Sequence, residues 1–217
     1  PRLLPLTKKM PVSLLEVAGK AILAHQLDGM QKAGIEDILV ITGFGADQIE
    51  KLCAGRASCI FNPFYESCNV AMNLWMVRQE LRSGFILQYS DILVPAELIG
   101  EILAREESIL LVIDRRGVDK EAEKVALRQG MVTAIGKEVD EPYGEFIGMA
   151  RFLPDVIPAT INELEEVARA DLDTSFPQFI QRLIRKGHLV KVYSTDRPWM
   201  DIDFPGDLEE ARRSWRR

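Results

Sequence analysis

Short runs of apolar, mostly β-branched residues alternate along this chain with segments of helical periodicity, and this alternation limits the fold more than any other feature. The expected strands are 38–42, 59–61, 85–89 and 109–113, and the expected helices are 21–33, 46–52, 73–81 and 96–105. Apolar runs without a polar alternation are typical of strands buried on both faces. Strands separated by helices predict a mostly parallel central sheet with helices on both faces.

The pattern changes after Asp114, where a hairpin is predicted. Residues 124–127 and 131–135 flank Gln129-Gly130, a pair that suits a tight turn. Further strands are expected at 145–152 and 189–193, and further helices at 161–168, 176–185 and 206–213. No repeat, low-complexity segment or linker interrupts the 217 residues. The sequence therefore predicts a single α/β domain over residues 1–217, with a small antiparallel β extension.

Composition excludes several classes of function. A net charge of -6 argues against a nucleic-acid-binding surface, which needs a basic face, although a single nucleotide needs only a few local donors and a metal. No apolar run approaches the roughly 20 residues of a membrane span, and no signal peptide is visible. The three cysteines are an odd number without metal-ligand spacing, which predicts reduced thiols and a cytoplasmic protein.

Two acidic sites lie where such a fold places its chemistry. Asp91 directly follows the strand expected at 85–89, and ligands of open α/β sheets bind beyond the carboxyl ends of the strands. Asp201 and Asp203 are two residues apart on an expected strand, so both side chains point to one face. Like charges on one face are unfavourable unless they are solvated or bridged by a cation. The residues alone leave both a Mg²⁺ site and an ordinary solvated surface open.

The first twenty residues read P-R-L-L-P-L-T-K-K-M-P-V-S-L-L-E-V-A-G-K. They resemble the opening motif of nucleotidyltransferases, which activate phosphorylated small molecules with a nucleoside triphosphate. Later segments match the same family in order: N-P-F-Y-E-S-C-N-V-A-M-N-L-W, F-I-L-Q-Y-S-D, E-A-E-K-V, G-E-F-I-G-M and W-M-D-I-D-F-P-G-D-L. Several of these are similar to the phosphocholine cytidylyltransferase-like branch, beside the sugar-phosphate nucleotidylyltransferases. The matches span nearly the whole chain.

The resemblance implies a Rossmann-like nucleotidyltransferase domain that transfers CMP from CTP to a small phosphorylated acceptor such as phosphocholine, with Mg²⁺ as cofactor. The residues implied in catalysis are Asp91, Asp203 and Arg2, of which Asp91 and Asp203 hold the metal. Those implied in nucleotide binding are Arg2, Thr7, Gly43 and Asn69. Those implied in acceptor binding are Lys124, Glu145, Trp199 and Asp201. A homodimer is left open, and so is a sugar 1-phosphate as acceptor.

Two residues and one segment depart from the family pattern. Val12 stands where a lysine beside the nucleotide phosphates is expected, and Ser90 stands where a glycine is expected before the acidic residue. A glycine-rich phosphate loop is expected upstream of Pro1. Val12 favours a second hypothesis, a catalytically weak member that binds a nucleotide and regulates, whereas the acidic pair Asp91 and Asp203 favours the enzyme.

Overall fold

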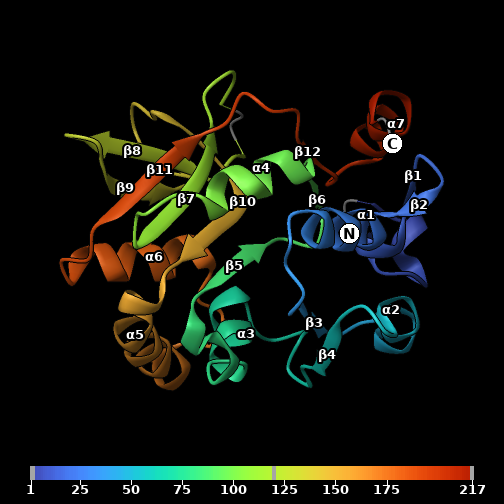
Figure 1. The fold of residues 1–217 in the computed structure, drawn as a ribbon, viewed down its shortest axis with the longest axis horizontal. Coiled ribbons are helices and arrows are strands. Elements are labelled where there is room, and N and C mark those ends of the chain that lie inside the picture. Colours follow the sequence, from blue (N-terminus) through green and yellow to red (C-terminus); the bar gives the residue numbers. More distant parts are fainter. Residues whose placement is uncertain (1–2, 119–120, 216–217) are drawn as a thin grey trace. The chain divides into compact units, whose positions relative to one another are not determined.

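A computed structural model describes residues 3–118 and 121–215, and the chain forms two compact units. Unit 1 comprises Pro1–Tyr65, Tyr89–Glu101 and Arg197–Arg217, and unit 2 comprises Glu66–Gln88 and Ile102–Asp196. Each unit is therefore assembled from stretches that are separated in the sequence (Figure 1). The single domain expected over residues 1–217 stays a prediction.

Unit 1 contains small sheets and three complete helices among its described residues. The elements are η1 Leu6–Lys8, η2 Val12–Leu14, β1 Glu16–Val17, β2 Lys20–Ala21, α1 Ile22–Lys32, β3 Leu39–Thr42, α2 Ala46–Cys53, β4 Ser58–Phe61, β6 Ile92–Leu93, β12 Met200–Asp201 and α7 Pro205–Ser214. Helix α4, Ala96–Leu103, begins in this unit. Strands β3 and β4 pair in parallel, and β1–β2 and β6–β12 pair antiparallel. The helices and strands predicted in these stretches are thus present, with ends that shift by one or two residues.

Two apolar clusters hold unit 1 together. Ile22 and Leu93 pack in one cluster with residues of the C-terminal stretch, including Ile202. The other joins α1 to α2, because Leu27 faces Ile49 and its neighbours. Both clusters are buried, so the first holds α1 to the C-terminal stretch of the unit and the second holds it to α2.

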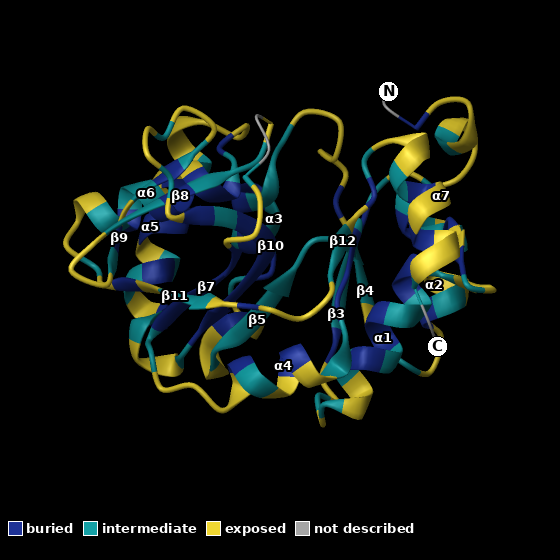
Figure 2. Cartoon of the chain, turned by 90° about the horizontal axis from the view of Figure 1, so that it is seen from above, coloured by how far each residue is buried: buried dark blue, intermediate teal, exposed yellow. Residues whose placement is uncertain are grey.

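Unit 2 is built around a six-stranded sheet in the order β11-β7-β10-β8-β9, with β5 also paired to β10. Its elements are α3 Val70–Met76, η3 Glu80–Ser83, β5 Phe85–Gln88, β7 Ile109–Asp114, β8 Lys124–Arg128, β9 Met131–Gly136, β10 Gly144–Phe152, η4 Pro154–Val156, α5 Ile157–Ala170, α6 Phe176–Arg185 and β11 Val190–Ser194. Strand β7 is buried along its whole length (Figure 2). Helices α3, α5 and α6 pack against one another, and α6 also contacts β9.

The α/β class is confirmed, with one correction to the sheet, which is mixed instead of mostly parallel. Strands β5 and β7 are both antiparallel to β10, which lies between them. Strand β11 is parallel to β7, so β5, β7 and β11 share one direction. The predicted hairpin is present as β8–β9, and its turn residues Gln129 and Gly130 both have positive φ. The chain leaves this hairpin for β10, which returns against the direction of its neighbours.

Two helices of unit 2 begin earlier than expected. Helix α3 comprises Val70–Met76. It begins at Val70 because the Asn69 side chain accepts a hydrogen bond from the Val70 N–H and caps the first turn. Helix α5 begins at Ile157 instead of 161, since Pro158 in its first turn has no N–H that needs a partner. In the described part of the chain, no helix is both long and apolar enough to cross a bilayer.

Candidate active site

Three aspartates from two distant stretches of unit 1 converge. One carboxylate oxygen from each of Asp91, Asp201 and Asp203 lies within 4.8 Å of the others. The pairing of β12 with β6 brings them together, because it sets Asp201 opposite Ile92, the residue that follows Asp91. Strand β12 ends at Asp201, so Asp203 lies just outside the strand on which both were expected.

Hydrogen bonds from backbone N–H groups anchor each side of this cluster. The Asp91 carbonyl oxygen accepts from the Ile202 N–H at 3.1 Å. The Asp207 carboxylate, in the first turn of α7, accepts from the N–H groups of Asp203 at 3.1 Å and Phe204 at 2.7 Å. These bonds fix the backbone that carries the aspartates. The backbone is therefore less free to move the three carboxylates apart.

The environment of the cluster disfavours ionisation of the Asp91 and Asp201 carboxylates. Burial raises the pKa of Asp91, a hydrogen bond from its own backbone opposes this, and the charge of Asp203 raises the pKa further. Loss of solvent around the Asp201 carboxylate, followed by repulsion from Asp91, Asp203 and Asp207, raises its pKa to about 7. Because Asp201 is an exposed residue, repulsion from the neighbouring carboxylates is the larger physical cause of this shift. A hard divalent cation with oxygen ligands relieves this repulsion, and the donor set therefore fits such an ion.

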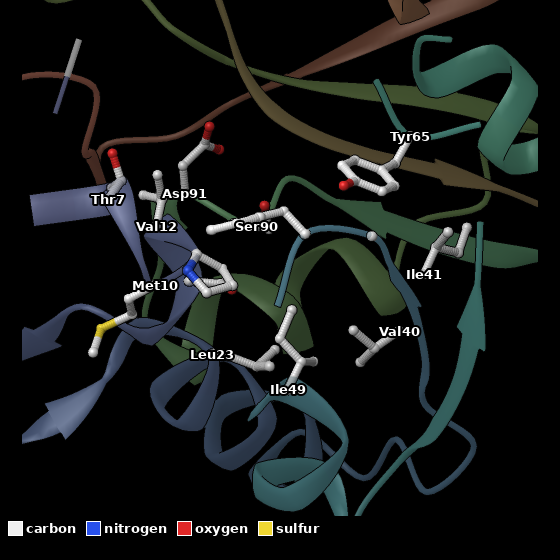
Figure 3. Close-up of a pocket in the computed structure, with 14 residues that line it drawn as sticks. Thr7, Met10, Val12, Leu23, Val40, Ile41, Ile49, Tyr65, Ser90 and Asp91 are labelled. Carbon is white, nitrogen blue, oxygen red and sulfur yellow. The ribbon is translucent and has the colours of Figure 1, made fainter. Parts of the chain in front are cut away.

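A pocket of about 380 Å³ opens beside Asp91 within unit 1 (Figure 3). Its polar lining includes Thr7, Ser90 and Asp91, whereas Leu23 and Ile49 belong to its apolar wall. Asp91 therefore belongs both to the aspartate cluster and to the pocket wall.

Both residues that depart from the family pattern line this pocket. Val12 begins the 3-10 helix η2, and Figure 3 shows its side chain on the same side of the pocket as that of Asp91. Ser90 places a hydroxyl-bearing side chain in the lining directly before Asp91. The exposed Lys8 and Lys9 are not among the lining residues, so they do not replace the expected cation in the pocket wall.

The other predicted site residues divide between the two units. Thr7 and Gly43 line the pocket with Asp91. A Cβ at Gly43 would lie 2.5 Å from the Cβ of Tyr65, so the close approach of these two segments requires a glycine. Trp199 precedes β12 in unit 1. Arg2 lies outside the described residues.

Asn69, Lys124 and Glu145 belong to unit 2. Asn69 caps α3 and donates a hydrogen bond to Asp173 at 3.3 Å. Lys124 and Glu145 face each other across β8 and β10, and the Lys124 ammonium group donates to the Lys137 carbonyl. Their acceptor-binding and nucleotide-binding roles stay predictions.

Two residues that support the cluster were not singled out from the sequence. Gln26 is a buried polar residue on the apolar face of α1, and a lone polar residue at a core position is a visible signal in the sequence. Asp207 lies in the first turn of the last helix, where an acidic residue is ordinary. Only the folded chain shows that its carboxylate holds the backbone at Asp203.

Comparisons with known proteins find similar nucleotidyltransferases. The CTP:phosphoglutamine cytidylyltransferase of Campylobacter jejuni is 24% identical over 96% of this chain and 93% of that protein. The UTP–glucose-1-phosphate uridylyltransferase AglF of Haloferax volcanii is 25% identical over 98% of this chain and 90% of that protein. The solved CTP:phosphocholine cytidylyltransferase of Streptococcus pneumoniae has a TM-score of 0.82 at 19% identity, over 99% of this chain and 94% of that one. No protein-family profile matches the chain.

Fold, aspartate cluster and relatives together define a nucleotidyltransferase. Along nearly its whole length the chain is similar to cytidylyltransferases and sugar-phosphate nucleotidyltransferases, and its fold matches that of a solved cytidylyltransferase. Transfer of a nucleotidyl group to a phosphorylated acceptor is the activity that these relatives support.

Proposed function

We propose that the chain catalyses the Mg²⁺-dependent transfer of CMP from CTP to a small phosphorylated acceptor, such as phosphocholine or a related phosphate or phosphonate. The observation that carries this proposal is the convergence of Asp201 and Asp203 on Asp91, which itself lines a pocket. The choice of CTP is supported by the Campylobacter and Streptococcus proteins, both of which are named for it.

The reaction needs positioning and charge neutralisation more than a nucleophilic side chain. An oxygen of the acceptor phosphate forms a bond to the α-phosphorus of CTP, the bond from that phosphorus to the β-phosphate oxygen breaks, and pyrophosphate leaves. The attacking oxygen is already anionic, so no Ser-His or Cys-His pair is required. Mg²⁺ held by Asp91, Asp201 and Asp203 would supply positive charge to the phosphates.

The remaining lining residues shape where the phosphates lie. The hydroxyl groups of Thr7 and Ser90 are hydrogen-bond donors in the polar part of the pocket. Val12 provides no charge, and a single electrostatic donor is worth about 3–4 kcal/mol of transition-state stabilisation. We therefore expect the enzyme to be slower than a relative that carries the lysine.

A turnover assay tests the proposal directly. Pyrophosphate release is measured with CTP, Mg²⁺ and phosphocholine, and then with the other nucleoside triphosphates and with sugar 1-phosphates. Asp91→Asn and Asp203→Asn should each reduce turnover at least about 100-fold, because each removes a charged metal ligand. Their circular dichroism spectra and melting temperatures should show that they still fold. Full activity in either variant would remove that residue from the metal site.

Two other functions have specific support. A sugar 1-phosphate acceptor is favoured by the similarity to the uridylyltransferase from Haloferax volcanii. A catalytically weak, nucleotide-binding regulatory role is favoured by Val12 in the pocket wall. Nucleotide binding without turnover for any pair of substrates would contradict the proposed transfer reaction and support the regulatory role.

A further inference from the structure

A single polar side chain interrupts the buried apolar face of α1. Gln26 is 6% exposed, and Ile22 and Leu27 on the same face are buried as well. The side-chain nitrogen Nε2 of Gln26 donates hydrogen bonds to the carbonyl oxygens of Tyr89 at 2.8 Å and Ile92 at 2.7 Å. A primary amide nitrogen carries two hydrogens, so these two bonds use its full donor capacity.

The two carbonyl groups flank the turn that carries the metal-ligand candidate. Tyr89 precedes Ser90 and Asp91, and Ile92 follows them, so one amide group holds the backbone on both sides of Asp91. The carbonyl of Asp91 itself accepts from the Ile202 N–H, in the stretch that brings the other two aspartates. The turn is thereby fixed by α1 and by the C-terminal stretch of unit 1.

Packing alone does not account for an amide at this position. A buried amide costs free energy unless it is hydrogen-bonded, and an apolar side chain of similar volume fills such a space without that cost. Mutual repulsion of the three carboxylates, whose oxygens lie within 4.8 Å of one another, favours movement of Asp91 away from the cluster. The two hydrogen bonds from Gln26 oppose this movement through the backbone.

The geometry points to Gln26 as a positioning residue of the metal site, which acts through the turn at 89–92 and sets the affinity of the aspartate cluster for a divalent cation. The inference rests on the proposed function, since it takes the cluster as the place where the metal binds. Partners outside the ligand set commonly change metal affinity or activity about 10–100-fold. Gln26 is not among the residues that line the pocket, so its loss should lower kcat and leave the KM for CTP nearly unchanged.

The test compares Gln26→Met with Leu27→Ala in the full chain. Gln26→Met keeps the side-chain volume and removes both donors, whereas Leu27→Ala loosens the packing of the same helix without removing a bond to the turn. Binding of Mn²⁺ is measured by electron paramagnetic resonance without nucleotide, and hydrogen exchange of residues 89–93 is measured without metal. We expect Gln26→Met to weaken Mn²⁺ binding about tenfold or more and to speed exchange in this segment. Leu27→Ala should change neither, although it lowers the melting temperature.

The results distinguish a failure of the positioning role of Gln26 from a failure of the proposed metal site. Mn²⁺ affinity and exchange at 89–93 that stay within twofold of the unsubstituted protein in a folded Gln26→Met variant would overturn the inference. An equal loss of Mn²⁺ affinity in Leu27→Ala would also overturn it, because general loosening of α1 would then explain the effect. If Gln26→Met does not fold, Gln26→Glu serves in its place, since it keeps the shape and presents oxygen atoms to the two carbonyls. Failure of the unsubstituted protein to bind Mn²⁺ would contradict the proposed metal site and with it the positioning role.

Discussion

Val12 and Ser90 show how single residues alter the chemistry of a pocket. Both line the pocket next to Asp91, so the substitutions act where nucleotide phosphates are proposed to bind. The valine removes a positive charge, and the serine adds a hydrogen-bond donor. The pocket therefore has less cationic character than the family pattern predicts, and its negative charge at the aspartate cluster is retained.

Restoring the missing charge should raise the rate. We expect Val12→Lys to increase kcat/KM for CTP about tenfold or more, since an ammonium group in the pocket wall stabilises charge that develops on the phosphates. Val12→Met is the matched control, because it lengthens the side chain without adding charge. Steady-state pyrophosphate release measures both. Equal rates for the lysine and methionine variants would show that charge at position 12 does not limit the reaction.

At the scale of single elements, an ion-pair group ties β2 to α1. Asp28 on α1 accepts hydrogen bonds from Lys20 at 2.6 Å and from Arg56, which follows α2, at 2.5 Å. The hydrogen bond from Lys20 contributes most to lowering the pKa of Asp28, partial burial opposes it, and Arg56 lowers the pKa further. The Asp28 side chain is 42% exposed, so solvent screens the pairs and their contribution to stability is modest.

The lowered pKa of Asp28 predicts how stability depends on pH. The Asp28 carboxylate ionises more readily in the folded chain than in the unfolded chain. The stabilisation is therefore present at neutral pH and is lost as the pH falls through the folded pKa, below the ordinary value for aspartate. We expect Asp28→Asn to lower the free energy of unfolding by about 0.5–1 kcal/mol at pH 7. In urea denaturation, the difference should disappear at a pH well below the ordinary pKa of aspartate. Asp37→Asn, at an exposed position of the same unit, serves as control; an equal effect there would exclude the ion pairs as the cause.

Local sequence patterns predicted most helices and strands, whereas the pairing of strands that lie far apart in the sequence could not be predicted from them. Helix α6 has the predicted ends, because Ser175 and Gln178 form a capping box that the local sequence encodes. The place of β10 between β5 and β7 depends on which segments meet in three dimensions, and no residue of Gly144–Phe152 encodes it. The same holds for the site. The sequence predicts Asp91 and Asp203 as metal ligands and Asp201 as an acceptor-binding residue, but the anchors at Gln26 and Asp207 appear only once distant stretches pair.

At the scale of the whole molecule, all residues of the aspartate cluster and of the pocket lining belong to unit 1. This assignment predicts where the chain responds to a divalent cation. We expect Mn²⁺ alone to slow hydrogen exchange in residues 89–93 and 199–204, because binding stabilises the closed state of the segments that carry the ligands. The hairpin β8–β9 of unit 2 should exchange at an unchanged rate. Protection that appears in the hairpin and not in these two segments would place the cation elsewhere.

The separation of the three aspartates in the sequence also has a consequence for synthesis of the protein. A ribosome makes the residues of the pocket wall, from Thr7 to Asp91, long before it reaches Asp201 and Asp203. Until then the growing chain has a single carboxylate at the site, and β6 lacks its partner β12. The charged cluster is thus completed only when the last stretch of unit 1 is made, and a product that stops before residue 200 would keep the pocket residues but lack two of the three aspartates.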